Sequence, residues 1–165
     1  MRLFFAFILL LMATGGGTFA QSYNGTVQGN FIVYSIQSLT ITGMSAPISF
    51  DSPNDYFNGV IAERYANLSV KSSVNWQLSF AAQSTYFTPL SNGGSTDMPS
   101  TVVGIRQSGQ ATFKTLTTQS QSLTNGSRGS ETAKHNFNID VSFNPGFKYN
   151  GGLYSIGVMY TLTRQ

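Results

Sequence analysis

The segment that decides the fold is residues 136–163, which read NFNIDVSF, then NPGFKYNGGL, then YSIGVMYTLT. In the first and third runs apolar and polar residues alternate, so every second side chain lies on one face of an extended strand. The middle run is rich in Asn, Pro and Gly, which favour turns. The pattern predicts two antiparallel strands joined by a turn-rich connection. Two strands cannot bury their apolar faces alone, so the rest of the chain must supply an opposing sheet.

The N-terminus has the pattern of an export signal. Arg2 precedes ten consecutive apolar residues, Leu3 to Met12, and Thr18-Phe19-Ala20 offers the small residues that signal peptidase prefers. Ten apolar residues span only about half of the hydrocarbon core, so a membrane anchor is disfavoured. We predict a signal peptide at residues 1–20 and a single exported β-sandwich domain at residues 21–165. No stretch in the mature chain reaches transmembrane length.

The composition narrows the classes of partner. The basic residues are scattered, with no cluster that could follow a phosphate backbone, so nucleic-acid binding is not expected. The chain has no cysteine, so the predicted exported domain does without disulfides. A domain of this length can bury a core large enough to fold without such links.

Other segments also have strand character. The strongest is 76–82, where Trp76 begins an alternating run on the apolar face. Residues 60–70 contain a stretch with helical propensity, but their alternating end favours a strand. Further predicted features are short strands at 31–36 and 39–41, a turn at 51–55, an edge strand at 99–105 that begins near Pro99, and a long polar loop or ragged hairpin at 118–135.

Together these segments predict an all-β fold. Short strands with frequent turn signals, and no apolar periodicity of helical type, indicate an immunoglobulin-like antiparallel β-sandwich of roughly seven to nine strands. Trp76, the only tryptophan, should fill its centre. The expected core contains Trp76, Phe80, Ile139, Val141, Val158 and Tyr160.

The residues that carry most catalytic and metal chemistry are sparse. His135 is the only histidine, and a metal site or catalytic triad needs more ligands or partners than one imidazole. The six carboxylates show no spacing that implies acid–base work. Asp51 and Asp55 share a turn in which a weak calcium site is conceivable, although turn formation explains them better. We therefore expect no enzyme activity, no catalytic residues, no metal site and no cofactor.

Exposed aromatic residues are the best candidates for contact with a ligand. A carbohydrate-binding platform needs aromatic rings in a row on the surface. Most aromatics here fall on alternating strand faces, which indicates a core role. The exceptions lie in predicted loops, and we take them as possible ligand contacts: Tyr86, Phe87, Phe147 and Tyr149.

Three segments together carry a resemblance to small exported bacterial β-sandwich proteins of the WxL-like and fimbrial-subunit-like kind, namely 50–59, 73–78 and 152–163. Trp76-Gln77-Leu78 has the form of the Trp-x-Leu motif that gives WxL domains their name. Tyr160-Thr161-Leu162 stands where a second such motif belongs, with Tyr in place of Trp. The resemblance implies an exported β-sandwich at the cell surface that binds the cell wall.

The C-terminus also resembles the last strand of fimbrial subunits of the chaperone–usher type. Gly152 lies about fourteen residues from the end, and Val158, Tyr160 and Leu162 alternate near it, while Arg164 replaces the usual penultimate Tyr. This resemblance implies a subunit that polymerises by strand exchange.

We therefore expect an exported structural or adhesive protein located in the periplasm, at the cell surface or outside the cell. Its expected partners are other surface proteins, further copies of itself, or a cell-wall or glycan ligand. The segment 26–36 and the C-terminal strand are the strand edges most suited to pairing with another chain. Two alternatives stay open: a pilus-type subunit that polymerises by strand exchange, and a secreted hydrolase built from dispersed carboxylates.

Overall fold

The computed structural model describes residues 30–43, 47–130 and 135–165. The chain divides into two units, residues 1–33 and 34–165. In the described part of the first unit, Phe31, Ile32 and Val33 are exposed. The predicted signal peptide lies outside the described residues.

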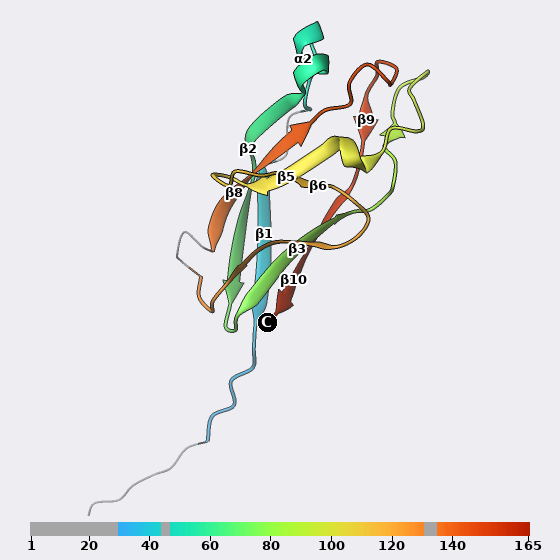
Figure 1. Ribbon diagram of the computed structural model, residues 1–165. Coiled ribbons are helices and arrows are strands. Elements are labelled where there is room, and N and C mark those ends of the chain that lie inside the picture. Colours follow the sequence, from blue (N-terminus) through green and yellow to red (C-terminus); the bar gives the residue numbers. More distant parts are fainter. Residues whose placement is uncertain (1–29, 44–46, 131–134) are drawn as a thin grey trace, which may run out of the picture. The chain divides into compact units, whose positions relative to one another are not determined.

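The second unit is built almost entirely from antiparallel strands, which confirms the predicted all-β class (Figure 1). A five-stranded sheet has the order β1-β2-β8-β5-β6, a three-stranded sheet the order β10-β3-β7, and β4 pairs with β9. Three of the ten strands in the described residues have only two residues. The strands are β1 Gln37–Gly43, β2 Val60–Ser72, β3 Trp76–Ala82, β4 Thr88–Pro89, β5 Val103–Gln107, β6 Lys114–Thr115, β7 Gln121–Gly126, β8 Asn136–Phe143, β9 Tyr154–Ser155 and β10 Val158–Arg164.

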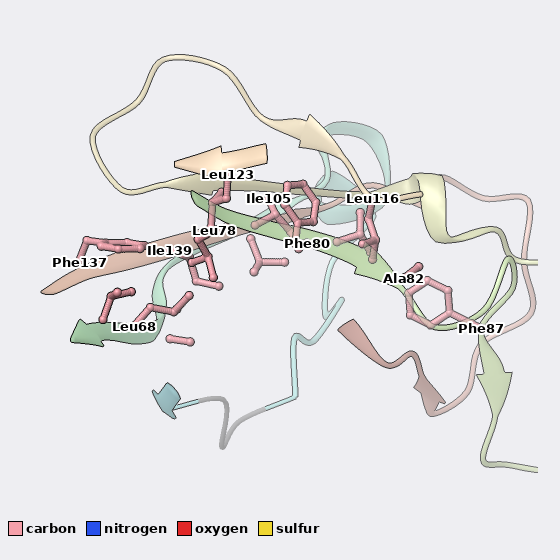
Figure 2. Packing of buried hydrophobic residues seen from close by; sticks show 14 of the residues in the cluster. Leu68, Leu78, Phe80, Ala82, Phe87, Ile105, Leu116, Leu123, Phe137 and Ile139 are labelled. Atoms are coloured by element: carbon pink, nitrogen blue, oxygen red, sulfur yellow. The ribbon is translucent and has the colours of Figure 1, made fainter. Parts of the chain in front are cut away.

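Most of the buried apolar side chains of the two larger sheets belong to one cluster. From β3, Trp76, Leu78 and Phe80 are at most 1% exposed. Their alternation with polar residues places them on one face of the strand. Figure 2 shows Leu78 and Phe80 near Ile105 of β5 and Ile139 of β8. Burial of these side chains is the main source of cohesion.

The expected core is confirmed for four of its six residues. Trp76, Phe80, Ile139 and Val141 are buried. The other two residues, on β10, are half-buried and pack against the cluster. The predicted strands at 60–70 and 76–82 are also confirmed, as β2 and β3.

The predicted pairing of the C-terminal strands is wrong. β8 belongs to the five-stranded sheet and β10 to the three-stranded sheet, so the turn-rich connection between them joins two sheets. The expected single strand at 154–163 is also interrupted, because β9 pairs with β4 whereas β10 pairs with β3. The break falls at Ile156-Gly157, where the Gly157 carbonyl accepts a hydrogen bond from Gln83 N at 2.9 Å.

Three other sequence predictions need correction. β5 is not an edge strand, because it lies between β8 and β6, and Pro99 instead precedes a short 3₁₀ helix at Ser100–Val102. The polar stretch expected to be a long loop or a ragged hairpin contains the strand β7, which pairs with β3 and buries one apolar side chain, Leu123. The described residues 31–36 are not in a strand.

The predicted turn at 51–55 is the start of a short helix, α2, Pro53–Asn58. Ser52 caps it, and Asp55 Oδ2 accepts hydrogen bonds from Ser52 N at 2.9 Å and Asp51 N at 3.0 Å. This capping box satisfies amide groups that the helix itself leaves unpaired. α2 and the connections that carry β4 and β9 lie at the same end of the unit, at the top of Figure 1.

Truncation of Trp76 tests the importance of the buried cluster. Because the indole is fully buried, Trp76→Ala should lower the free energy of unfolding by about 3–5 kcal/mol. Urea unfolding followed by circular dichroism measures this change. Met159→Ala is the control, because Met159 is 51% exposed and should change stability by no more than about 0.5 kcal/mol. A loss below about 1 kcal/mol for Trp76→Ala would contradict the packing described here.

Candidate binding groove

A groove of about 630 Å³ opens into one side of the apolar cluster. Its floor is formed by buried side chains of β5 and β8, including Ile105 and Ile139, and one wall is β10. The connection before α2 and the connections on either side of β9 complete it. Its apolar and aromatic lining includes Pro47, Ile48, Phe50, Tyr56, Tyr65, Phe87, Met98, Val103, Ile105, Ile139, Val141, Phe143, Tyr149, Ile156, Val158 and Tyr160.

The groove borders strand edges that have no ladder partner among the described residues. The pairing of β1 with β2 stops at Gly43, which lies opposite Ala66, so the first half of β2 lacks a β1 partner. Gly43 has a φ of 95°, a conformation that favours glycine. β10 stands at the end of its sheet, and in the described residues β3 is its only ladder partner. Within residues 30–43, 47–130 and 135–165, the outer edge of β10 is therefore unpaired beside an apolar groove.

The groove is almost uncharged. Among the lining residues that the structure describes, Asp51 is the only one with a charged side chain. Burial, and next the neighbouring Tyr65, raise the pKa of Tyr160 well above its usual range. Tyr160 is therefore neutral at any ordinary pH. A groove lined by aromatic and apolar side chains, with a single charged residue among those described, favours apolar ligands over ionic ones.

A bulge in β2 shapes the wall of the groove. Three residues, Glu63 to Tyr65, stand opposite the single residue Asp140 of β8. Arg64 adopts a positive φ of 52°, and its backbone N–H donates to Asp140 Oδ1 at 3.0 Å. The bulge thus bends β2 at the point where Tyr65 reaches the groove.

Three residues hold the buried Asp140 carboxylate through three hydrogen bonds, one of which is also an ion pair. Besides Arg64 N–H, it accepts from Arg106 Nε at 2.9 Å and from the Ser108 hydroxyl at 2.5 Å. Burial alone would raise the pKa of Asp140, but these hydrogen bonds and the Arg106 charge outweigh it and hold the pKa below its ordinary value. The satisfied partners indicate a structural role for this carboxylate.

The four predicted ligand contacts occupy different places. Phe87 is buried, and it lines the groove together with Tyr149. Tyr86 is half-exposed and forms an isolated bridge with Pro99. Phe147 is exposed and stacks on Tyr56 of α2, with ring centroids 5.1 Å apart.

Sequence reasoning missed the groove residues of β8 and β10 and the aromatic residues of α2. Val158 and Tyr160 were expected in the core, and their alternation gives no sign that the strand beside them is missing. Tyr56 and Phe57 meet Phe147 only through the fold. No local sequence signal could have revealed that contact.

In the part of the chain that the structure describes, His135 and the carboxylates Asp55 and Asp140 make structural contacts. His135 is buried against Trp76, and its Nε2 hydrogen-bonds the Ser127 carbonyl at 2.8 Å. Asp55 caps α2, and its hydrogen bonds from Ser52 and then Asp51 lower its pKa. In residues 30–43, 47–130 and 135–165, no three His, Asp or Glu side chains come together as a metal site would require. Across those same ranges, no helix has the length and apolar character to cross a membrane.

Comparison with known proteins does not assign the chain to a family. No protein-family model matches the chain, and no curated protein is similar to it in sequence. A function can therefore be proposed only from the groove and the residues around it.

The hydrogen bonds of Asp140 predict how the free energy of unfolding depends on pH. Because the folded-state pKa of Asp140 lies below its ordinary value of 3.8, its contribution is complete above about pH 5 and is lost as the pH falls through the folded-state pKa. Asp140→Asn should lower the free energy of unfolding by about 2–3 kcal/mol at pH 7 and by less at about pH 3. Urea unfolding at several pH values measures this, with Asp97→Asn at an exposed position as the control. An equal cost at both pH values would contradict the assignment.

Proposed function

We propose that the protein is an exported structural or adhesive surface protein that acts through protein–protein contacts. The observation that carries this proposal is the apolar groove, with Asp51 as its one charged lining residue among those described, beside the edge of β10 that the described strands leave unpaired. An immunoglobulin-like sandwich is the proposed architecture, supported by the single cluster that the two larger sheets share. The resemblance to WxL-like and fimbrial proteins agrees with this proposal but does not establish membership of either family.

The groove suits an extended peptide strand. A strand that adds to a sheet edge gains backbone hydrogen bonds along its length, while alternate side chains enter pockets beside the edge. β10 supplies such an edge, and its inward residues Val158 and Tyr160 form one wall of the groove. The expected ligand is therefore an uncharged segment with apolar residues at every second position.

A pilus-type subunit is the second candidate, and one observation favours it. Residues 31–36 read FIVYSI, and all five apolar side chains in this segment are 70–90% exposed. In an extended strand, Ile32, Tyr34 and Ile36 share one face. That uncharged apolar face has the pattern that the groove of a second copy could accept.

The length of the segment favours a second copy over the same chain. Ile36 is held at the Gln37 end of β1 by hydrogen bonds with Ser73, whereas the groove begins beyond the Gly43 end. The seven residues of β1 span about 23 Å. The five residues 31–35 span only about 16 Å when extended, so they are too short to run back along β1 into the groove.

The proposal includes no enzymatic activity. The two carboxylates with the strongest hydrogen-bonding environments, Asp55 and Asp140, serve a helix cap and a buried ion pair. A secreted hydrolase is the competing class. If hydrolysis were detected, its loss in Asp51→Asn or Asp97→Asn variants that still fold would support that class instead.

Removal of the N-terminal segment tests the strand-exchange mechanism. The chain from residue 21 onward should form concentration-dependent assemblies, and deletion of residues 21–36 should abolish them without unfolding the domain. Size-exclusion chromatography with light scattering measures the mass, and circular dichroism checks the fold. Monomers in both cases would remove strand exchange while leaving loop-mediated protein contacts open.

Point variants locate the contact more sharply. Tyr34→Asp places a charge on the apolar face of the segment and should weaken assembly by more than about tenfold, because an unpaired charge cannot enter the groove without a large cost. Ser35→Asp adds the same charge to the opposite face and is the matched control. Val158→Arg in the groove should act like Tyr34→Asp. Equal effects of Tyr34→Asp and Ser35→Asp would contradict insertion of this face.

A further inference from the structure

A second surface lies at the end of the unit that carries α2. Tyr56 and Phe57 of α2 and Phe147 of the β8–β9 connection form an exposed aromatic cluster, which we call the aromatic tip. Phe147 stacks on Tyr56 with an interplanar angle of 25°, and it meets Phe57 edge-on with ring centroids 4.9 Å apart. Phe57 is 73% exposed and Phe147 60% exposed.

The fold holds the aromatic tip in place. Phe50 lies beneath it, because its ring contacts both Tyr56 and the Phe143 ring at centroid distances of 5.2 Å. Gly59 ends α2 directly against Asn144, where an added Cβ would come within 2.9 Å of the Asn144 side chain. The capping box fixes the other end of α2. Two large apolar rings are thus kept in the solvent by a structured support, and this arrangement reduces the entropy cost of ligand binding.

The size of the aromatic tip argues against a large protein partner. Aromatic side chains each bury about 150–250 Å² when covered, so the exposed parts of Phe57 and Phe147 present only about 250 Å². A stable protein interface buries about 800 Å² on each partner. The tip instead matches a ligand that covers one or two rings.

The groups around the rings indicate the chemistry of that ligand. Asn54 and Asn58 lie one helical turn apart on α2, next to Phe57, and both are exposed. Asn58 Nδ2 donates to Asn54 Oδ1 at 2.7 Å, which leaves Asn54 an amide donor and Asn58 a carbonyl acceptor. Asp55, the nearest carboxylate of the helix, is engaged in the cap. Flat rings flanked by neutral donors and acceptors suit a molecule with an apolar face and hydroxyl groups at its edge.

We propose that the aromatic tip binds a neutral sugar ring of a polysaccharide. The C–H-rich face of a pyranose ring packs on Phe57 or Phe147 through dispersion contacts. Its hydroxyl groups hydrogen-bond the Asn54 and Asn58 side chains. The tip shares Tyr56 with the lining of the groove, but its two exposed rings, Phe57 and Phe147, are not groove residues, so sugar binding does not depend on strand uptake.

Titration with defined oligosaccharides tests this proposal. Chitohexaose, cellohexaose and maltohexaose are each added to the chain from residue 21 onward, up to about 10 mM, and followed by calorimetry and amide chemical shifts. We expect at least one of them to bind with a Kd near 1 mM and to shift the amide signals of α2 and residues 144–148. No binding by any of the three would overturn the proposal.

Variants then assign the binding to the aromatic tip. Phe57→Ala and Phe147→Ala should each weaken binding by about three- to tenfold, whereas Phe57→Trp, which keeps a flat ring, should preserve it. Leu90→Ala is the matched control, because Leu90 is another exposed apolar residue but lies outside the tip. Unchanged affinity in both alanine variants would overturn the proposal, as would a change in assembly mass without a change in sugar binding. Assembly mass measured on the same samples distinguishes this failure from a failure of strand exchange.

Discussion

The apolar face of β3 is the constraint on which the rest of the structure depends. Trp76, Leu78 and Phe80 lie in the middle of the three-stranded sheet and contribute to the cluster shared with the five-stranded sheet. The chain has no cysteine, so no disulfide contributes to stability. Cohesion must therefore come from burial of this face, and close packing leaves little tolerance around it. Gly126 on β7 illustrates this, because an added Cβ would meet the Trp76 ring at 2.5 Å.

The same cluster is open to solvent beside the end of β1, and the proposed uptake of a peptide strand follows from that opening. Val158 and Tyr160 of β10 line a groove together with the residues of β8 that form its floor. A chain of aromatic contacts runs from Phe87 through Phe143 and Phe50 to the rings of the aromatic tip. Core packing thus continues outward into two surfaces of different character. One is an apolar groove beside a strand edge, and the other is a small set of exposed rings.

The predicted site residues show which features of a side chain the local sequence pattern can predict. Loop position correctly placed Phe147 on the surface, but it could not distinguish Phe147 from Phe87, which turns into the core. The difference arises from contacts with distant segments, since Phe87 packs on Phe143 of β8 and Phe147 packs on Tyr56 of α2. The structural role of Asp140 could not be predicted either, because it depends on contacts with distant segments. Its partners Arg64 and Arg106 lie on two other strands.

The sequence by itself determined the all-β class and the positions of β2, β3 and β8, because the alternation of apolar side chains along a strand is a local property. It also determined that Trp76, Phe80, Ile139 and Val141 would be buried. Only the tertiary structure decided which strands pair, where the C-terminal run breaks at Gly157, and that the polar β7 completes a sheet. Those features depend on contacts between segments far apart in the chain. The groove is also decided by the tertiary structure, because the sequence of a strand does not show whether both of its edges are paired.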